Sequence, residues 1–136
     1  MNKIFFVSCL LIILTGCVQD SPNIKQIENL QFFIDNKSDN RVTEIESGLQ
    51  YLVLEEGNPE GISPNADQII SAHFHGTLTN GEVFWSSLDS EPLTIELSKL
   101  IIGCQKIISL MKVGDKWRAF IAVSYTHLRA PETNGY

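Results

Sequence analysis

The feature that most constrains the fold of this chain is one helical stretch set among short segments of alternating apolar residues. Between residues 98 and 110 the apolar residues recur mostly at intervals of three and four, which is typical of a helix buried on one side. Strand-type segments are expected at 49–54, 69–76, 82–86, 92–97 and 116–123, with a tight turn at Asn80-Gly81. This pattern predicts an α+β domain in which antiparallel strands surround one short helix.

Composition and charge exclude several classes of protein. The chain has 136 residues, enough for one ordinary domain, and carries ten Lys and Arg against sixteen Asp and Glu. A net charge of −6 argues against nucleic-acid binding, because no basic surplus is available to replace the counterions of a phosphate backbone. Three cysteines are too few for a disulfide-rich scaffold.

The N-terminus has the pattern of an export signal. Lys3 precedes an apolar run over residues 4–14, which is too short to cross a bilayer as a helix. The following Leu14-Thr15-Gly16-Cys17 resembles the lipobox of bacterial lipoproteins. The resemblance implies that residues 1–16 are a signal peptide, removed before Cys17, and that the Cys17 sulfur carries a lipid. An ordinary secretory signal and a short buried helix are the alternatives.

Residues 17–46 are predicted to be a tether followed by a short helix. A polar stretch with Pro22 comes first. Apolar residues at helical spacing then predict an amphipathic helix that ends near Asp35-Asn36. These residues are Ile24, Ile27, Leu30, Phe33 and Ile34.

A series of motifs between residues 47 and 123 resembles the FK506-binding-protein (FKBP) type of peptidyl-prolyl isomerase. The motifs appear in the order Ser47-Gly48-Leu49-Gln50-Tyr51, Ala72-His73-Phe74-His75-Gly76, Asn80-Gly81, Val83-Phe84, Ser86-Ser87, Glu91-Pro92, Leu100-Ile101 with Gly103, and Met111 through Trp117. The upstream Phe33-Ile34-Asp35-Asn36 resembles the domain entry of the macrophage-infectivity-potentiator subgroup. Some members of that subgroup dimerise through an N-terminal helical region, so a homodimer is a further expectation.

The resemblance implies an FKBP-like half-barrel of antiparallel strands wrapped around the short helix, with an apolar pocket between them. Its reaction is rotation about the X–Pro bond, whose amide resonance sets a barrier of about 18–20 kcal/mol. A dry pocket that binds the twisted amide better than the planar one accelerates this rotation. The expected partners are therefore proline-containing polypeptides, with no cofactor, metal or nucleic acid.

Four residues match the pocket positions that act on the substrate: Phe74, Phe84, Leu100 and Ile101. The resemblance implies that the backbone N–H of Ile101 holds the substrate carbonyl. Phe74 stands where the family usually has Tyr, so the ring is kept and the hydroxyl is lost. The alternative for Phe84, Leu100 and Ile101 is an ordinary place in the hydrophobic core.

Other pocket positions depart from the family pattern. Trp85 replaces the usual Asp, and Cys104 replaces the usual Trp of the pocket floor. Leu93 and Ile95 stand where an aromatic residue is common. These departures predict a pocket that binds the proline ring weakly.

The family pattern stops at Val123, where a flap and a last strand are expected. Residues 124–136 resemble a translated sequencing adapter, which predicts a partial domain over 47–123 and a non-native tail. An incomplete sheet would leave an exposed strand edge.

Two readings of function stay open. The first is a lipid-anchored isomerase that assists the folding of exported proteins, on the outer membrane and facing the periplasm. The second is a non-catalytic binding or chaperone module with the same fold on the cell envelope. His73 and His75 are two apart on a predicted strand, so both would point to one face and could seat a metal ion. No third ligand is apparent in the sequence, so two solvent-facing histidines are expected instead.

Overall fold

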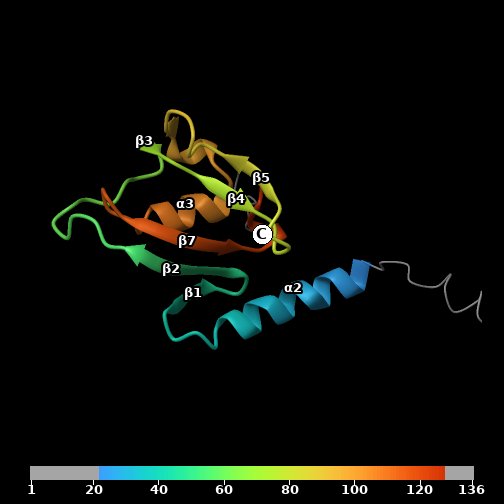
Figure 1. Ribbon diagram of the computed structural model, residues 1–136. Coiled ribbons are helices and arrows are strands. Elements are labelled where there is room, and N and C mark those ends of the chain that lie inside the picture. The colour runs from blue at the N-terminus through green and yellow to red at the C-terminus, as the bar shows by residue number, and fades with distance from the viewer. Residues whose placement is uncertain (1–21, 128–136) are drawn as a thin grey trace, which may run out of the picture.

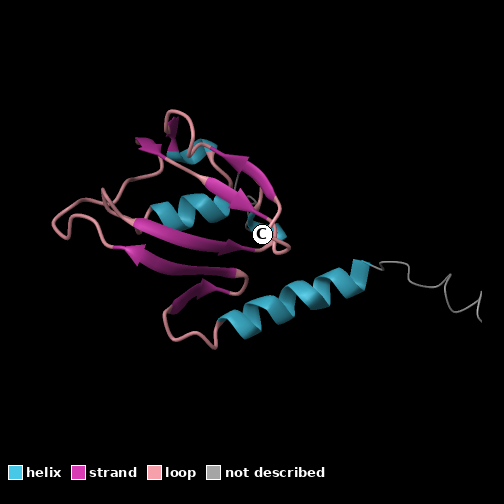
Figure 2. Ribbon diagram, in the orientation of Figure 1, coloured by secondary structure: helices cyan, strands magenta, loops and turns pink. Residues whose placement is uncertain are grey.

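The computed structural model describes residues 22–127. Antiparallel strands surround a short helix, and a longer helix projects to one side (Figure 1; Figure 2). The helices and strands are α2 (Pro22–Asn36), β1 (Val42–Glu46), β2 (Leu49–Glu55), β3 (Ile69–Ala72), β4 (His75–Thr77), β5 (Val83–Ser86), β6 (Leu93–Glu96), α3 (Ile102–Ile108) and β7 (Lys116–Ile121). Two short 3₁₀-helices, at Leu97–Lys99 and Val123–Tyr125, complete the described chain.

The strands form three separate antiparallel sheets. One sheet has the order β1-β2-β7, and the other two are the pairs β3-β6 and β4-β5. The central strand β2 runs from Leu49 opposite Ile121 to Glu55 opposite Lys116. The predicted α+β class is therefore confirmed, and the strands of residues 22–127 do not close into a barrel.

The buried apolar core of residues 22–127 is small. Its members are Leu49, Leu52, Leu97 and Ile107. They come from β2, from the first 3₁₀-helix and from α3, which packs against β7. Leu49 and Leu52 are three residues apart on β2 and so lie on opposite faces of the sheet, with Leu52 on the face of Gln50.

The strand predicted over 69–76 is interrupted at His73 and Phe74. β3 pairs with β6, whereas β4 pairs with β5, so the chain changes partner between them. Ser87, which is 3% exposed, holds this bend: its N–H donates to the Phe74 carbonyl (2.9 Å), and its hydroxyl accepts from the Phe74 N–H (3.0 Å). Period-two alternation continues through such a bend, so the sequence pattern did not reveal it.

The helical stretch predicted over 98–110 is shorter than expected. The 3₁₀-helix Leu97–Lys99 is followed by an extended Ile101 (φ −57°, ψ 150°), and α3 starts only at Ile102. Val123 was expected to end the last strand, but it lies in the second 3₁₀-helix and is 76% exposed.

β1 was not predicted at all, because its alternation is the reverse of the usual one. Glu44 and Glu46 are partly buried, whereas Ile45 is exposed. Both glutamates have cationic partners, Lys37 for Glu44 and Lys106 for Glu46. A pattern search expects apolar residues on the covered face and therefore misses this strand.

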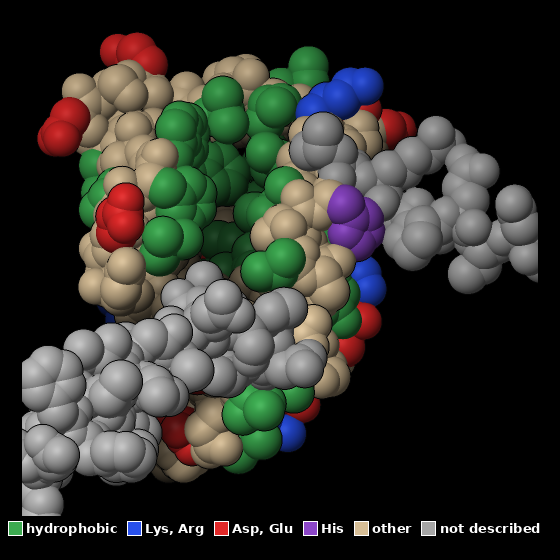
Figure 3. All heavy atoms as spheres, turned by 90° about the vertical axis from the view of Figure 1, so that its right-hand side faces the viewer, with side chains coloured by type: hydrophobic (Ala, Val, Ile, Leu, Met, Phe, Trp, Pro, Cys, Tyr) green, Lys and Arg blue, Asp and Glu red, His purple; other side chains and the backbone are tan. Residues whose placement is uncertain are grey.

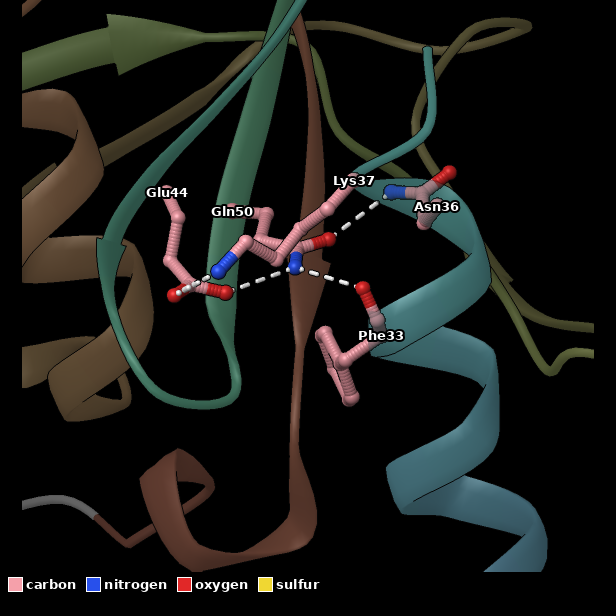
Figure 4. A network of polar contacts seen from close by, with 5 residues as sticks. All are labelled: Phe33, Asn36, Lys37, Glu44 and Gln50. Carbon is pink, nitrogen blue, oxygen red and sulfur yellow. Dashed lines mark hydrogen bonds and ion pairs between the residues drawn. The ribbon is translucent and has the colours of Figure 1, made fainter.

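Gln50 attaches the end of α2 to the sheet (Figure 4). This side chain is 0% exposed and accepts a hydrogen bond from the Asn36 amide (2.9 Å). Its own amide donates to the Phe33 carbonyl and to the Glu44 carboxylate, both at 2.9 Å. Bonds from Gln50 and Lys37 hold the pKa of Glu44 below its ordinary value. A buried polar group with every bond made fixes the helix end in place.

The rest of α2 makes little contact with the domain. Phe32 lies near Phe120, with ring centroids 6.0 Å apart. Ile27, Leu30 and Ile34 are 64%, 60% and 62% exposed. The predicted helix is confirmed in its position, but three residues of its predicted apolar face meet solvent. Within residues 22–127, no helix has the length and apolar character needed to cross a membrane.

Replacing Gln50 with Ala should destabilise the protein. The Phe33 carbonyl, the Asn36 amide and the Glu44 carboxylate lose a partner together, which costs about 1–3 kcal/mol of unfolding free energy. Urea unfolding measures the change. Gln31→Ala is the control, since the Gln31 side chain donates to the exposed Asp35, and its effect should stay within ~0.5 kcal/mol. Equal stability of the two variants would show that the Gln50 junction contributes nothing.

Candidate functional site

The predicted pocket residues lie on three parts of the chain. Phe74 is in the bend between β3 and β4, Phe84 and Trp85 are on β5, and Leu100-Ile101 connects the first 3₁₀-helix to α3. Figure 3 shows the side of the molecule that lies at the right of Figure 1. This side is hollowed, and hydrophobic side chains surround the hollow.

Among the aromatic residues of the site, Phe74 is partly buried, whereas Phe84 and Trp85 are exposed. The rings of Phe74 and Trp85 are tilted, with centroids 6.1 Å apart. The Phe84 ring lies over Gly76, where an added Cβ would be 2.5 Å from Cζ of that ring. Phe84 is 66% exposed. It is therefore not a core residue, and the absence of a side chain at Gly76 leaves room for its ring.

The connection at Leu100-Ile101 is shaped by a residue that the sequence analysis missed. The Gln105 side chain donates to the carbonyls of Leu100 (2.6 Å) and Ser98 (3.1 Å). Within residues 22–127 the backbone N–H of Ile101 has no acceptor. The turn therefore presents an unused donor, as an interaction with a substrate carbonyl requires. The sequence did hold a signal for Gln105, since it is a polar residue inside a mostly apolar helical stretch.

The remaining pocket positions are more scattered. Leu93 and Ile95 are partly buried on β6, opposite Ala72 and Ile70 of β3. They therefore belong to a different sheet from Trp85. Cys104 lies on α3 and is partly buried, and burial raises the pKa of its thiol to about 11. This thiol is held neutral.

The two histidines of the site each contact a serine. His73 Nδ1 is 2.9 Å from the Ser87 carbonyl oxygen, and His75 Nδ1 is 3.0 Å from the Ser86 hydroxyl. In the part of the chain that is described, no three His, Cys, Asp or Glu side chains gather in a way that suits a metal ion. The His75 contact joins β4 to β5, whereas the His73 contact joins the bend before β4 to the residue after β5.

The residues that follow β7 pack onto the domain. The Tyr125 hydroxyl donates to Glu46 (2.9 Å), and Lys106 also pairs with Glu46. Both bonds, that from Lys106 first, hold the pKa of Glu46 below its ordinary value. The Ile102 N–H donates to the carbonyl of His127 (2.8 Å). Residues 123–127 therefore contact β1 and α3. Whether 124–136 is native stays a prediction, and residues 128–136 lie outside the described part.

Comparisons with known proteins agree with this arrangement. A family model for "FKBP-type peptidyl-prolyl cis-trans isomerase" matches residues 60–133. The FKBP-type isomerase FkpA of Aeromonas hydrophila is 39% identical over 67% of this chain and 34% of its own length. The outer membrane protein MIP of Legionella longbeachae is 32% identical over 66% of this chain and 38% of its own length. The chain therefore spans little more than a third of these curated relatives.

A solved structure confirms the fold. The crystal structure of a peptidyl-prolyl cis-trans isomerase from Pseudomonas syringae pv. tomato superposes with a TM-score of 0.63 at 25% identity. The similarity covers 74% of this chain and 74% of the other. The FKBP-like fold with antiparallel strands around a short helix is thus shown, as the sequence motifs predicted.

The raised pKa of Cys104 predicts a slow thiol. At about pH 8 the thiolate fraction should be about a hundredfold lower than for an exposed cysteine, and disulfide reagents should label Cys104 correspondingly slowly. Labelling should speed up as pH rises toward 11 and on unfolding in urea. A chain with Cys9→Ser and Cys17→Ser leaves Cys104 as the single reporter. Fast labelling of the folded chain at neutral pH would contradict the burial of this thiol.

Proposed function

Because this chain belongs to the FKBP-type peptidyl-prolyl cis-trans isomerase family, we propose that it isomerises X–Pro bonds in exported polypeptides. The observation that carries the proposal is the Ile101 N–H, which has no acceptor within residues 22–127. Phe74, Phe84 and Leu100 accompany it as the residues that contact the substrate. Activity is proposed for the protein as a whole, since the chain covers only part of its relatives' length.

The proposed reaction needs an apolar pocket with a hydrogen-bond donor, and it needs no cofactor. As the X–Pro bond twists, amide resonance is lost and the charge separation between its oxygen and nitrogen falls. An apolar wall from Phe74 and Phe84 favours this less polar state over the planar one. The Ile101 N–H holds a substrate carbonyl, and the two bonds from Gln105 keep the turn that presents it. Gln105 acts here as a positioning residue.

Two departures make the proposed enzyme a weak one. Cys104 is much smaller than an indole, so a proline ring above α3 loses packing contacts. Trp85 takes the place of a carboxylate and puts its ring beside Phe74 instead. Leu93 and Ile95 on β6 supply aliphatic contacts in place of aromatic ones.

We propose the cell envelope as the place of action. Residues 1–16 would be removed as a signal, the Cys17 lipid would anchor the protein, and residues 17–46 would connect the anchor to the domain. Cys17 lies outside the described residues, so support comes from the sequence motif and from a relative named as an outer membrane protein. Several acyl chains on one residue give stable anchoring. We place the anchor on the outer membrane, facing the periplasm.

A homodimer through α2 belongs to the same proposal. Ile27, Leu30 and Ile34 recur on one side of the helix and are each about three-fifths exposed, at 64%, 60% and 62%. An apolar helical stripe with no cover in residues 22–127 is the geometry that helix pairing uses.

A binding or chaperone module without catalysis is the second candidate. The exposure of all four residues of β5 favours it, because an open apolar strand holds extended chains without enclosing a proline.

Restoring the two family-type side chains should raise isomerase activity. Cys104→Trp with Trp85→Asp is expected to increase kcat/KM by about one to two powers of ten in a protease-coupled proline peptide assay. The full-length parent gene product is the protein to use, with each single variant alongside. Gln105→Ala should lower activity because the Ile101 turn loses its two bonds, while Gln31→Ala serves as the surface control. No activity in any variant would favour the binding module.

Lipid attachment should depend on Cys17 alone. Expressed in a Gram-negative host, the protein should incorporate labelled fatty acid and fractionate with membranes. Cys17→Ala should remove both properties, whereas Cys9→Ala should remove neither, because Cys9 lies in the part of the signal that is cut away. Label on the Cys17→Ala protein would contradict the anchor.

A further inference from the structure

β5 and the turn after it form an apolar surface without cover in the described chain. All four residues of β5 are exposed, although the Phe84 ring lies over Gly76 and the Trp85 ring lies beside Phe74. Val83, Phe84, Trp85 and Leu88 are 51%, 66%, 44% and 58% exposed, and we call these four residues the β5 patch. Exposed apolar surface on this scale is typical of a binding face. Figure 3 shows hydrophobic side chains gathered on this side of the molecule.

The charged residues next to the β5 patch along the chain are all acidic. Between Val42 and Ser98 the chain has no Lys or Arg. Glu82 adjoins Val83, Asp89 adjoins Leu88, and Glu91 follows two residues later, all three exposed. Within residues 22–127 the ion pairs of the protein involve Asp39, Glu44, Glu46 and Glu55. The three carboxylates beside the patch therefore have no cationic partner there.

We propose that the β5 patch docks extended polypeptide segments in which apolar residues are flanked by Lys or Arg. This inference rests on the proposed function, since it names the class of substrate that the same site selects. The apolar side chains of the segment would cover Val83, Trp85 and Leu88, and its cations would lie beside Glu82 and Asp89. An acidic segment would meet three carboxylates of its own sign, which lowers its affinity.

Trp85 gives this preference a physical basis. A broad ring at this position adds apolar area beside Phe74, with centroids 6.1 Å apart, and presents its face to incoming cations as well. Ser86 and Ser87 bind His75 and His73, so the strand that carries Trp85 is held from β4 and from the bend before it. The patch is thereby presented on a fixed hairpin.

Peptide binding to the full chain tests the proposal. Three fluorescently labelled peptides share one apolar core around a proline and differ only in flanking residues, which are Lys, Ser or Glu. Fluorescence anisotropy should show the highest affinity for the Lys peptide, a lower one for the Ser peptide and the lowest for the Glu peptide. At low salt the affinities for the Lys and Ser peptides should differ about three- to tenfold. The difference should vanish near 1 M salt, where the Debye length is about 3 Å.

Matched variants locate the effect. Glu82→Gln with Asp89→Asn should remove most of the preference for Lys. Glu56→Gln with Glu60→Gln changes the net charge equally but acts on exposed residues of the loop after β2, and should leave the preference intact. Leu88→Ser should weaken the binding of all three peptides. Every substituted side chain is exposed, so thermal unfolding should be unchanged and serves as the check on folding.

Three results would overturn the proposal. The first is equal binding of the Lys, Ser and Glu peptides. The second is an equal loss in both double variants, which would reflect the overall charge of the protein. The third is no peptide binding together with self-association that Leu88→Ser abolishes, which would assign the patch to a second copy. Binding is measured without turnover, so an inactive protein that still prefers the Lys peptide would contradict only the proposed isomerase activity.

Discussion

The pairing of β2 with both β1 and β7 is the interaction on which the described structure depends. Leu49 and Leu52 of β2 are buried, and Leu49 lies opposite Ile121 of β7. The same strand carries Gln50, whose buried amide binds the end of α2 on one side and Glu44 of β1 on another. One strand therefore holds the sheet, the core and the projecting helix, because its alternate residues serve different neighbours.

The proposed site depends on parts of the chain with fewer buried contacts. Phe74 and Trp85 meet where β3 gives way to β4, and Ser87 fixes that bend. The Ile101 turn is held by the Gln105 side chain. The Ile101 turn keeps its N–H available within residues 22–127, because neither a helix nor a sheet uses it, whereas both backbone groups of Phe74 are bonded to Ser87.

Exposed apolar surface links the proposals. The β5 patch and the α2 stripe of Ile27, Leu30 and Ile34 both lack cover within residues 22–127, yet their surroundings differ. The patch adjoins three carboxylates that have no cationic partner in the described residues, which favours a cationic polypeptide as the occupant. The stripe lies on a helix whose end is fixed by Gln50, so the helix is presented in a set direction and favours a like partner. The two surfaces are alike in hydrophobicity, and the charge beside them distinguishes the partners that each one favours.

The sequence by itself determined the fold class, the positions of most strands, the end of α2 and the family, because apolar periodicity and turn residues are local signals and the motifs occur in order. Only the tertiary structure decided the rest. Two glutamates of β1 are partly buried because Lys37 and Lys106 pair with them from elsewhere in the chain. The strand over 69–76 divides because its halves pair with different partners, and the Ile101 turn forms because Gln105 reaches back to it. Such contacts join residues distant along the chain or reverse the usual pattern, so no local period records them.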